Sequence, residues 1–148
     1  MSIFNSINIS SSGLTAERTR MDIISKNIAN ANTTRTSSGS PYRRQMVVFQ
    51  ENNKPSFSNY LSLYSNSNVL SNKDGVKISA IVEDQSPFKK VYEPGHPDAD
   101  KDGYVNMPNV DMVKEMVDMI SAARAYEANI TSINSSKAMA MKALNIGK

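Results

Sequence analysis

The sequence contains no cysteine and no tryptophan, and only one of its 148 residues is a histidine. The absence of cysteine excludes disulfides, thiolate zinc sites and a cysteine nucleophile. The single histidine, His96, lies between a glycine and a proline and has no second histidine with which to hold a metal, so we interpret it as a turn residue. Aromatic residues make up only 7% of the chain, which predicts a modest globular core.

Long apolar segments are also missing. Nothing approaches the ~18–20 apolar residues of a membrane span, so we do not expect an integral membrane protein. Residues 1–6 lack the basic start and the apolar run of a secretory signal peptide, and we therefore expect any export to use another route. A net charge of +3 is too small to indicate a nucleic-acid partner. Because no catalytic constellation or phosphate-binding loop appears, we expect neither an enzyme nor a cofactor.

The last quarter of the chain carries a seven-residue apolar repeat. Alternating steps of four and three residues give Met112, Met116, Met119, Ala123, Tyr126, Ile130, Ile133, Lys137, Ala140 and Leu144. A repeat of this length predicts a helix that packs in a coiled coil or a helix bundle. Pro108 and Asn109 indicate where the helix begins, and Asn109 is a candidate cap. Lys137 is the one position that breaks the repeat, and a polar residue there would influence register or partner choice.

The first 33 residues are also predicted to be helical. Their apolar positions recur at intervals of seven, with two further residues that widen the stripe: Ile7, Leu14, Met21, Ile28, Ile24 and Ala31. Charged residues occupy the opposite face. Even a good isolated helix is marginal in water, so this stripe requires a partner.

The middle of the chain has a different character. Strands are predicted at 42–50, 76–82 and 88–92, a long loop at 51–75, and a turn at 94–97. The predicted fold is therefore mainly α with a small β insert. Three regions follow: a helix over 1–33, a β-rich and loop insert over 34–108, and a helix over 109–148. We expect the two helices to pack as an antiparallel, coiled-coil-like pair.

One segment has the character of a metal site. Asp98, Asp100, Asp102 and Gly103 reproduce the first half of a calcium-binding loop. Asn109 stands where a bidentate glutamate is needed, and a polar surface turn explains the same residues. A calcium-binding interaction module that uses these aspartates remains the alternative function.

Two terminal patterns carry a family resemblance. The first comprises SGLTAER at 12–18, SKNIANANT at 25–33 and PYRR at 41–44. The second comprises GYV at 103–105, PNVD at 108–111, EMVDMI at 115–120 and AYEAN at 125–129. Together they resemble the bacterial flagellar axial proteins, in particular the basal-body rod proteins, and the short length fits a proximal-rod member.

The resemblance implies a structural subunit of a rod in the periplasm. In such a rod the terminal helices form the inner layer of a hollow helical tube, which transmits torque and conducts exported subunits. The chain would be exported without a cleaved signal by the flagellar type III apparatus. Its partners would be copies of itself, other rod proteins, and neighbouring parts of the basal body and export apparatus. A cell-wall hydrolase is a further alternative, but the sequence offers it no catalytic residues.

The expected assembly residues lie on both helices: Leu14, Met21, Ile24 and Ile28, with Met112, Met116, Met119, Ala123, Tyr126, Ile130, Ile133 and Leu144. The residues that carry the family motif are Asn27, Asn30, Asn32, Thr33, Tyr126 and Asn129. No metal ligand beyond the three aspartates is expected.

Overall fold

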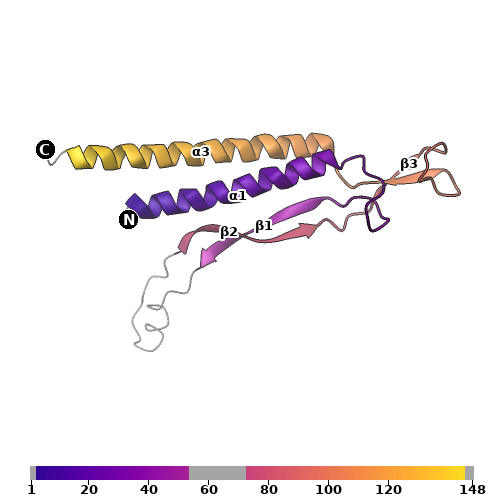
Figure 1. Ribbon diagram of the computed structural model, residues 1–148, viewed down its shortest axis with the longest axis horizontal. Coiled ribbons are helices and arrows are strands. Elements are labelled where there is room, and N and C mark those ends of the chain that lie inside the picture. Colours follow the sequence, from indigo (N-terminus) through magenta and orange to yellow (C-terminus); the bar gives the residue numbers. More distant parts are fainter. Residues whose placement is uncertain (1–2, 54–72, 146–148) are drawn as a thin grey trace, which may run out of the picture.

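The computed structural model describes residues 3–53 and 73–145, in which two long helices accompany a small β region (Figure 1). Helix α1 spans Ile3–Ala29 and helix α3 spans Met112–Asn145. The strands are β1 (Gln45–Asn53), β2 (Lys73–Glu83), β3 (Lys89–Tyr92) and β4 (Tyr104–Met107). The predicted fold class, mainly α with a small β insert between terminal helices, is confirmed. Neither helix in the described residues has the long apolar stretch that a membrane crossing needs.

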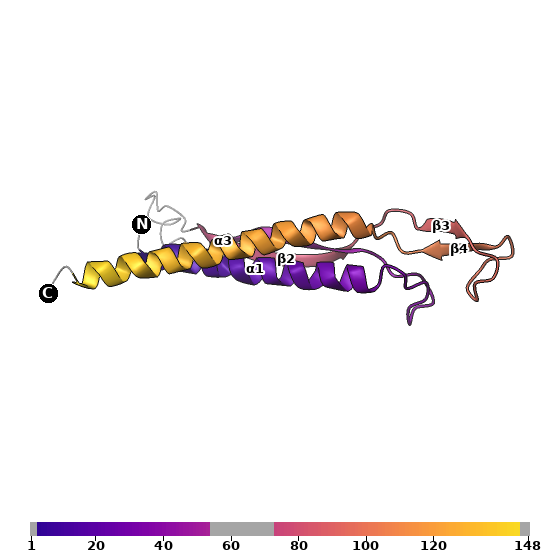
Figure 2. The same ribbon diagram turned by 90° about the horizontal axis from the view of Figure 1, so that it is seen from above.

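The elements form three layers. Helix α1 lies between α3 on one side and the β1–β2 hairpin on the other, and it contacts both (Figure 1). The two helices run antiparallel, so the beginning of α1 lies beside the end of α3. The β3–β4 hairpin projects beyond the end of the helix pair that is opposite the two chain termini (Figure 2). The molecule is consequently elongated, and most of its side chains remain near the surface.

Both sheets are two-stranded and antiparallel. In the first sheet Gln45 pairs with Glu83, and an irregularity between Val48 and Phe49 shifts the register. The alternating, β-branched sequence of β2 explains its strand conformation. The strands predicted at 76–82 and 88–92 fall on β2 and β3, and the strand predicted at 42–50 begins three residues later and extends to Asn53.

One expectation for the insert was wrong, and one of its strands was not expected. Residues 51–53 and 73–75, which were expected to belong to a loop, extend β1 and β2 because they pair with each other across the hairpin. The rest of the expected loop, 54–72, lies outside the described residues. Strand β4 was not predicted, because a four-residue strand is too short to show a periodic pattern. It forms by pairing with β3, and it buries Val105.

The beginning of α3 also differs from expectation. Asp111 caps the helix: its Oδ1 accepts hydrogen bonds from the backbone N–H groups of Val113 and Lys114 at 3.1 and 3.4 Å. Asn109, the predicted cap, is two residues too early, and its side chain binds other parts of the chain instead. The helix therefore begins at Met112, two residues later than a cap at Asn109 predicts.

Candidate functional site

The contact line between the two helices repeats every seven residues. The facing positions with contacts are 6, 13 and 27 on α1 and 136, 129 and 115 on α3, and the same spacing places 20 opposite 122; we call these four layers the helix seam. The hydroxyl oxygens of Ser6 and Ser136 are 3.3 Å apart. Between the first two layers, Ser10 donates to Ser132 at 3.4 Å. The seam is therefore built from small and polar side chains.

Close approach of the helices explains this composition. A Cβ atom on Gly13 would lie 3.1 Å from Nδ2 of Asn129, which is tighter than ordinary contact. Ala122, the α3 residue of the third layer, is completely buried. Large side chains in place of Gly13 or Ala122 would force the helices apart, so the large apolar residues of α3 lie elsewhere.

The apolar repeat predicted for α3 is rotated away from the centre of this seam. Met119, Ala123, Tyr126 and Ile133 are half-buried at its edge. Met112, Met116, Ile130 and Leu144 are exposed, as is Lys137. On α1, Ile24 is buried, whereas Leu14, Met21 and Ile28 are half-buried. The residues expected at one packed seam thus divide between a partly covered edge and an open face.

The fourth layer of the seam contains a buried polar cluster, which was not predicted. Asn27 is 1% exposed, and its side-chain amide makes four hydrogen bonds. Its Nδ2 donates to the Gln45 carbonyl at 2.9 Å and to Oε2 of Glu115 at 3.0 Å. Its Oδ1 accepts from the Tyr42 hydroxyl and from the Gln45 N–H, both at 2.9 Å. One side chain therefore connects the end of α1 to the beginnings of β1 and α3.

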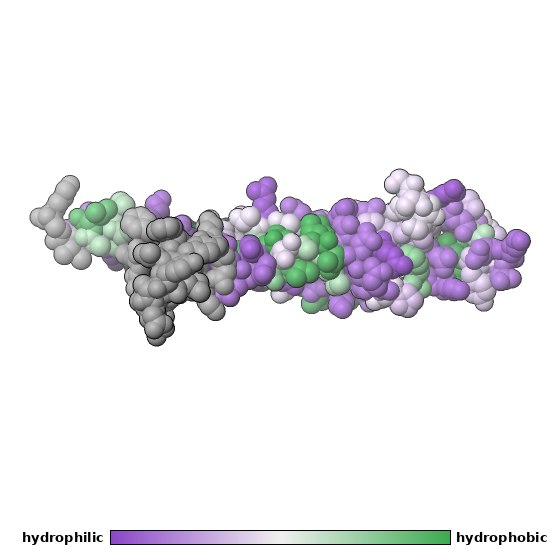
Figure 3. All heavy atoms as spheres, turned by 90° about the horizontal axis from the view of Figure 1, so that it is seen from below, coloured by the Kyte–Doolittle hydropathy of each residue, from purple (hydrophilic) through white to green (hydrophobic). Residues whose placement is uncertain are grey.

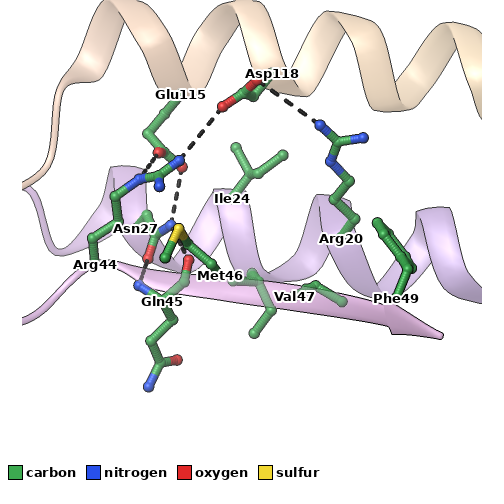
Figure 4. Close-up of a pocket in the computed structure, with 11 residues that line it drawn as sticks. Arg20, Ile24, Asn27, Arg44, Gln45, Met46, Val47, Phe49, Glu115 and Asp118 are labelled. Atoms are coloured by element: carbon green, nitrogen blue, oxygen red, sulfur yellow. Dashed lines mark hydrogen bonds and ion pairs between the residues drawn. The ribbon is translucent and has the colours of Figure 1, made fainter. Parts of the chain in front are cut away.

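Glu115 and Arg44 complete the ionic part of the cluster (Figure 4). Glu115 is completely buried, and its Oε1 accepts a hydrogen bond from Nε of Arg44 at 2.6 Å. The other arm of the guanidinium lies 3.5 Å from Asp118, which also lies 3.9 Å from Arg20 on α1. A buried carboxylate needs such partners, because desolvating an unpaired charge is costly. The ion pair thus fixes α3 to the segment that enters β1.

Asn109 extends the cluster towards the sheets. Its Oδ1 accepts from the Arg44 N–H at 2.9 Å, and its Nδ2 donates to the carbonyl oxygens of Asp84 and Ser86 at 3.1 and 3.3 Å. We use the name polar junction for the set Asn27, Tyr42, Arg44, Asn109 and Glu115. An open cleft of about 340 Å³ adjoins it, lined partly by apolar residues of β1.

Two groups in this region titrate abnormally. Burial raises the pKa of the Tyr42 hydroxyl, and the negative charges of Glu115 and Glu83 raise it further. Hydrogen bonds from the Ser86 hydroxyl and N–H lower the pKa of Asp84, which is half-buried. The first shift follows from the enclosure of the polar junction, whereas the second reflects a local turn.

The other motif residues have separate places. Asn30 donates to the Lys26 carbonyl at 2.9 Å and accepts from the Thr33 hydroxyl at 3.2 Å, so both residues end α1. Asn32 is exposed and Tyr126 is half-buried. Asn129 lies over Gly13 in the second seam layer. Of the six predicted motif residues, only Asn27 belongs to the polar junction.

The aspartates of the calcium hypothesis do not form a metal site. Asp98 accepts a hydrogen bond from Thr34 at 2.9 Å and lies 3.7 Å from Arg35, which neutralises its charge. The backbone of Asp100 pairs with Tyr104, and Gly103 closes the turn with a φ of 78°. Within 3–53 and 73–145, no group of three or more acidic or histidine residues could hold a metal ion. This arrangement gives no support to the calcium alternative.

A close contact holds the β1–β2 hairpin against α1. The Ser12 hydroxyl accepts a hydrogen bond from the Val76 N–H at 3.1 Å and donates to the Ile9 carbonyl at 2.6 Å. Gly75 has a φ of 85°, and a Cβ atom at this position would overlap the Ser12 hydroxyl. Only glycine satisfies both conditions.

Apolar side chains are exposed at the start of α3. Met112, Val113, Met116, Val117 and Ile120 are 41–67% exposed, and we call them the α3 outer face. The β1–β2 hairpin leaves Val48, Phe49, Ile81 and Val82 at 38–48% exposure. Figure 3 shows a hydrophobic patch near the middle of the molecule. Large exposed apolar patches are typical of protein interaction sites.

Comparison with known proteins gives a consistent result. The family described as "Flagella basal body rod protein" matches residues 7–35, and the family described as "Flagellar basal body rod FlgEFG protein C-terminal" matches residues 101–146. The chain is 52% identical to the flagellar basal-body rod protein FlgC of Bacillus subtilis, over 100% of both chains. It is 51% identical to that of Borreliella burgdorferi, over 99% of this chain and 98% of the relative. It is 41% identical to that of Escherichia coli O157:H7, over 100% of both chains.

Proposed function

Because this chain belongs to the FlgC family of flagellar basal-body rod proteins, we propose that its two long helices are the parts through which it assembles with neighbouring rod subunits. It is a structural subunit of the basal-body rod and not an enzyme. Rod proteins assemble with other rod components.

The observation that carries the proposal is the direction in which α3 points its apolar residues. Its small and polar residues face α1, and the α3 outer face points to solvent. Burying a large apolar side chain completely contributes about 1.5–3 kcal/mol. In the isolated chain the α3 outer face does not contribute this stabilisation, because its side chains are exposed. A neighbouring subunit that packs on this face would bury them.

The expected assembly residues fit this arrangement in two groups. Met112, Met116, Ile130 and Leu144 are exposed and available to neighbours. Ile24 is buried within the chain, and the half-buried residues lie where a neighbour could complete their cover. We propose that the exposed residues make the contacts that hold subunits together in a hollow helical tube, which transmits torque and conducts exported subunits.

We also propose where this assembly takes place and with what. The rod would lie in the periplasm, and the chain would reach it through the flagellar export apparatus. Its neighbours would be copies of itself, other rod proteins and adjoining parts of the basal body. Fractionation tests the route: in a strain without a working export apparatus, the chain should stay in the cytoplasmic fraction, and its periplasmic recovery there would contradict the proposal.

Deletion of the gene, followed by electron microscopy of purified basal bodies, tests the function as a whole. Rods should be absent, and the chain supplied in trans should restore them together with swimming. Intact rods in the deletion strain would refute the proposed role.

A substitution tests the surface. Ile120→Asp places a charge on the α3 outer face, where the side chain is 62% exposed, so the chain should keep its helix content but fail to restore rods. The matched control is Ser121→Asp, which adds the same charge at the next residue, an exposed polar position at the edge of this face. Equal restoration by both variants would show that this face makes no contact in the rod.

A further inference from the structure

We infer that the polar junction determines the register of the helix pair, with Glu115 as the residue that selects it and Asn27 and Arg44 as its positioning partners. Register here means which residue of α1 faces which residue of α3. This role differs from general stabilisation, because it concerns the choice between two or more ways of pairing the same helices.

Most of the helix seam cannot make that choice. Its layers repeat every seven residues, so an axial displacement by one heptad, about 10.5 Å, superposes layers on layers. Gly13 faces Asn129 in the observed register and would face Ser136 or Ala122 in the two displaced ones, without a clash in either case. The pairs Ser6–Ser136 and Ser10–Ser132 are long, weak hydrogen bonds. Apart from Arg20, the small side chains of the first three layers thus leave several registers open.

The polar junction distinguishes between these registers. In one displaced register Asn27 would face Ala122, and its amide and the Arg44 guanidinium would lose the carboxylate that they share. In the other, Glu115 would face Arg20 and move a full heptad from both of its present donors. Arg44 lies on neither helix but at the entrance to β1, so it does not move with α3. A single buried polar position in a heptad seam is known to specify register in this way.

The choice of register has a consequence for the outside of the molecule. Sliding α3 by one heptad would move the α3 outer face relative to the β1–β2 hairpin by about 10.5 Å. Both surfaces expose apolar side chains, so their relative position defines the shape that a neighbour meets. The polar junction therefore fixes where the α3 outer face lies relative to the β1–β2 hairpin, although no residue of the junction belongs to either exposed apolar surface.

Disulfide trapping in the purified chain measures the register directly. The chain has no cysteine of its own, so each introduced pair is unique. Ser6→Cys with Ser136→Cys reports the observed register, because the two hydroxyl oxygens are only 3.3 Å apart. Ser6→Cys with Ala143→Cys, and Ser6→Cys with Asn129→Cys, report the two displaced registers. Each pair is oxidised in the parent chain and in chains that carry Glu115→Ala or Glu115→Gln.

In the parent chain only the first pair should form a disulfide in high yield. Glu115→Ala should raise the yield of at least one displaced pair on the order of tenfold, because the buried penalty that excludes it is gone. Glu127→Ala is the control: it breaks an exposed ion pair with Arg124 on the same helix and should leave all three yields unchanged.

Two results would overturn the inference. One is a Glu115→Ala chain that stays helical and still forms only the disulfide between positions 6 and 136. The other is the loss of helix content and of all three disulfides in both Glu115 variants, which would mean that the junction is needed for pairing itself and not for the choice of register. Because the disulfides form within one purified chain, neither result depends on rod assembly.

Discussion

Removing the Arg44 side chain should destabilise the folded chain by about 3–5 kcal/mol, because it leaves a buried carboxylate without its counter-charge. That carboxylate, Glu115, is 0% exposed and lies 2.6 Å from Nε of Arg44. Glu115→Ala should cost less, about 1.5–3 kcal/mol. In that variant Arg44 is still 14% exposed to water and keeps Asp118 at 3.5 Å. With both side chains removed, neither charge is stranded, so the double variant should cost at least about 2 kcal/mol less than the sum of the single variants.

Urea unfolding followed by far-ultraviolet circular dichroism gives the four free energies of this cycle. The matched control is the same cycle at Arg124 and Glu127, whose side chains are 78% and 63% exposed and 2.8 Å apart. Its coupling should be about 0.3–0.5 kcal/mol. Single-variant costs at Arg44 and Glu115 that add to within about 0.5 kcal/mol would refute the reasoning, because they would show that the two groups act independently.

Two further predictions concern the same framework. The pKa of Tyr42 is raised by burial and then by Glu115 and Glu83, so its contribution to stability should be complete below the unfolded pKa of about 10 and be lost as pH rises through the folded pKa. Tyr42→Phe should therefore flatten the fall of the urea midpoint at alkaline pH. An unchanged slope would contradict this. In urea unfolding, Gly75→Ala should lower the free energy of unfolding by about 1–2 kcal/mol more than the matched Gly39→Ala. Both glycines have positive φ, but only a side chain at position 75 would meet another side chain. Equal losses would show that the hairpin shifts freely.

The long elements could be predicted from the sequence because their signals are local. Helical periodicity in residues near Ile24 and Met119 and strand alternation around Ile78 each depend on a few neighbours along the chain. The four-residue β4 has no such signal, and it exists only because β3 lies beside it. The extension of β1 to Asn53 has the same origin, since its pairing partner is Lys73.

The polar junction could not be predicted in the same way, because its members are distant in sequence. Glu115 stands in the first turn of α3, where an exposed acid would compensate the helix dipole, yet it is buried and paired with Arg44, 71 residues away. The available signal was the spacing of fourteen residues, or two heptads, that separates Glu115 from Asn129 on α3 and Gly13 from Asn27 on α1. The packed seam was instead predicted at the apolar repeat, because apolar residues are the ones most often buried.

The placement of polar residues inside the helix pair and apolar residues outside it bears on how the rod is held together. The α3 outer face retains roughly half of its apolar surface in water, so covering it would contribute on the order of 5 kcal/mol per subunit. Association itself costs about 4–15 kcal/mol in lost freedom of motion. One such contact therefore barely offsets the cost of holding a neighbour. Several neighbours that cover the α3 outer face and the exposed side chains of the β1–β2 hairpin would exceed it, because a subunit that is already held by one contact loses little further freedom in making the next. A chain built in this way favours a lattice over an isolated pair.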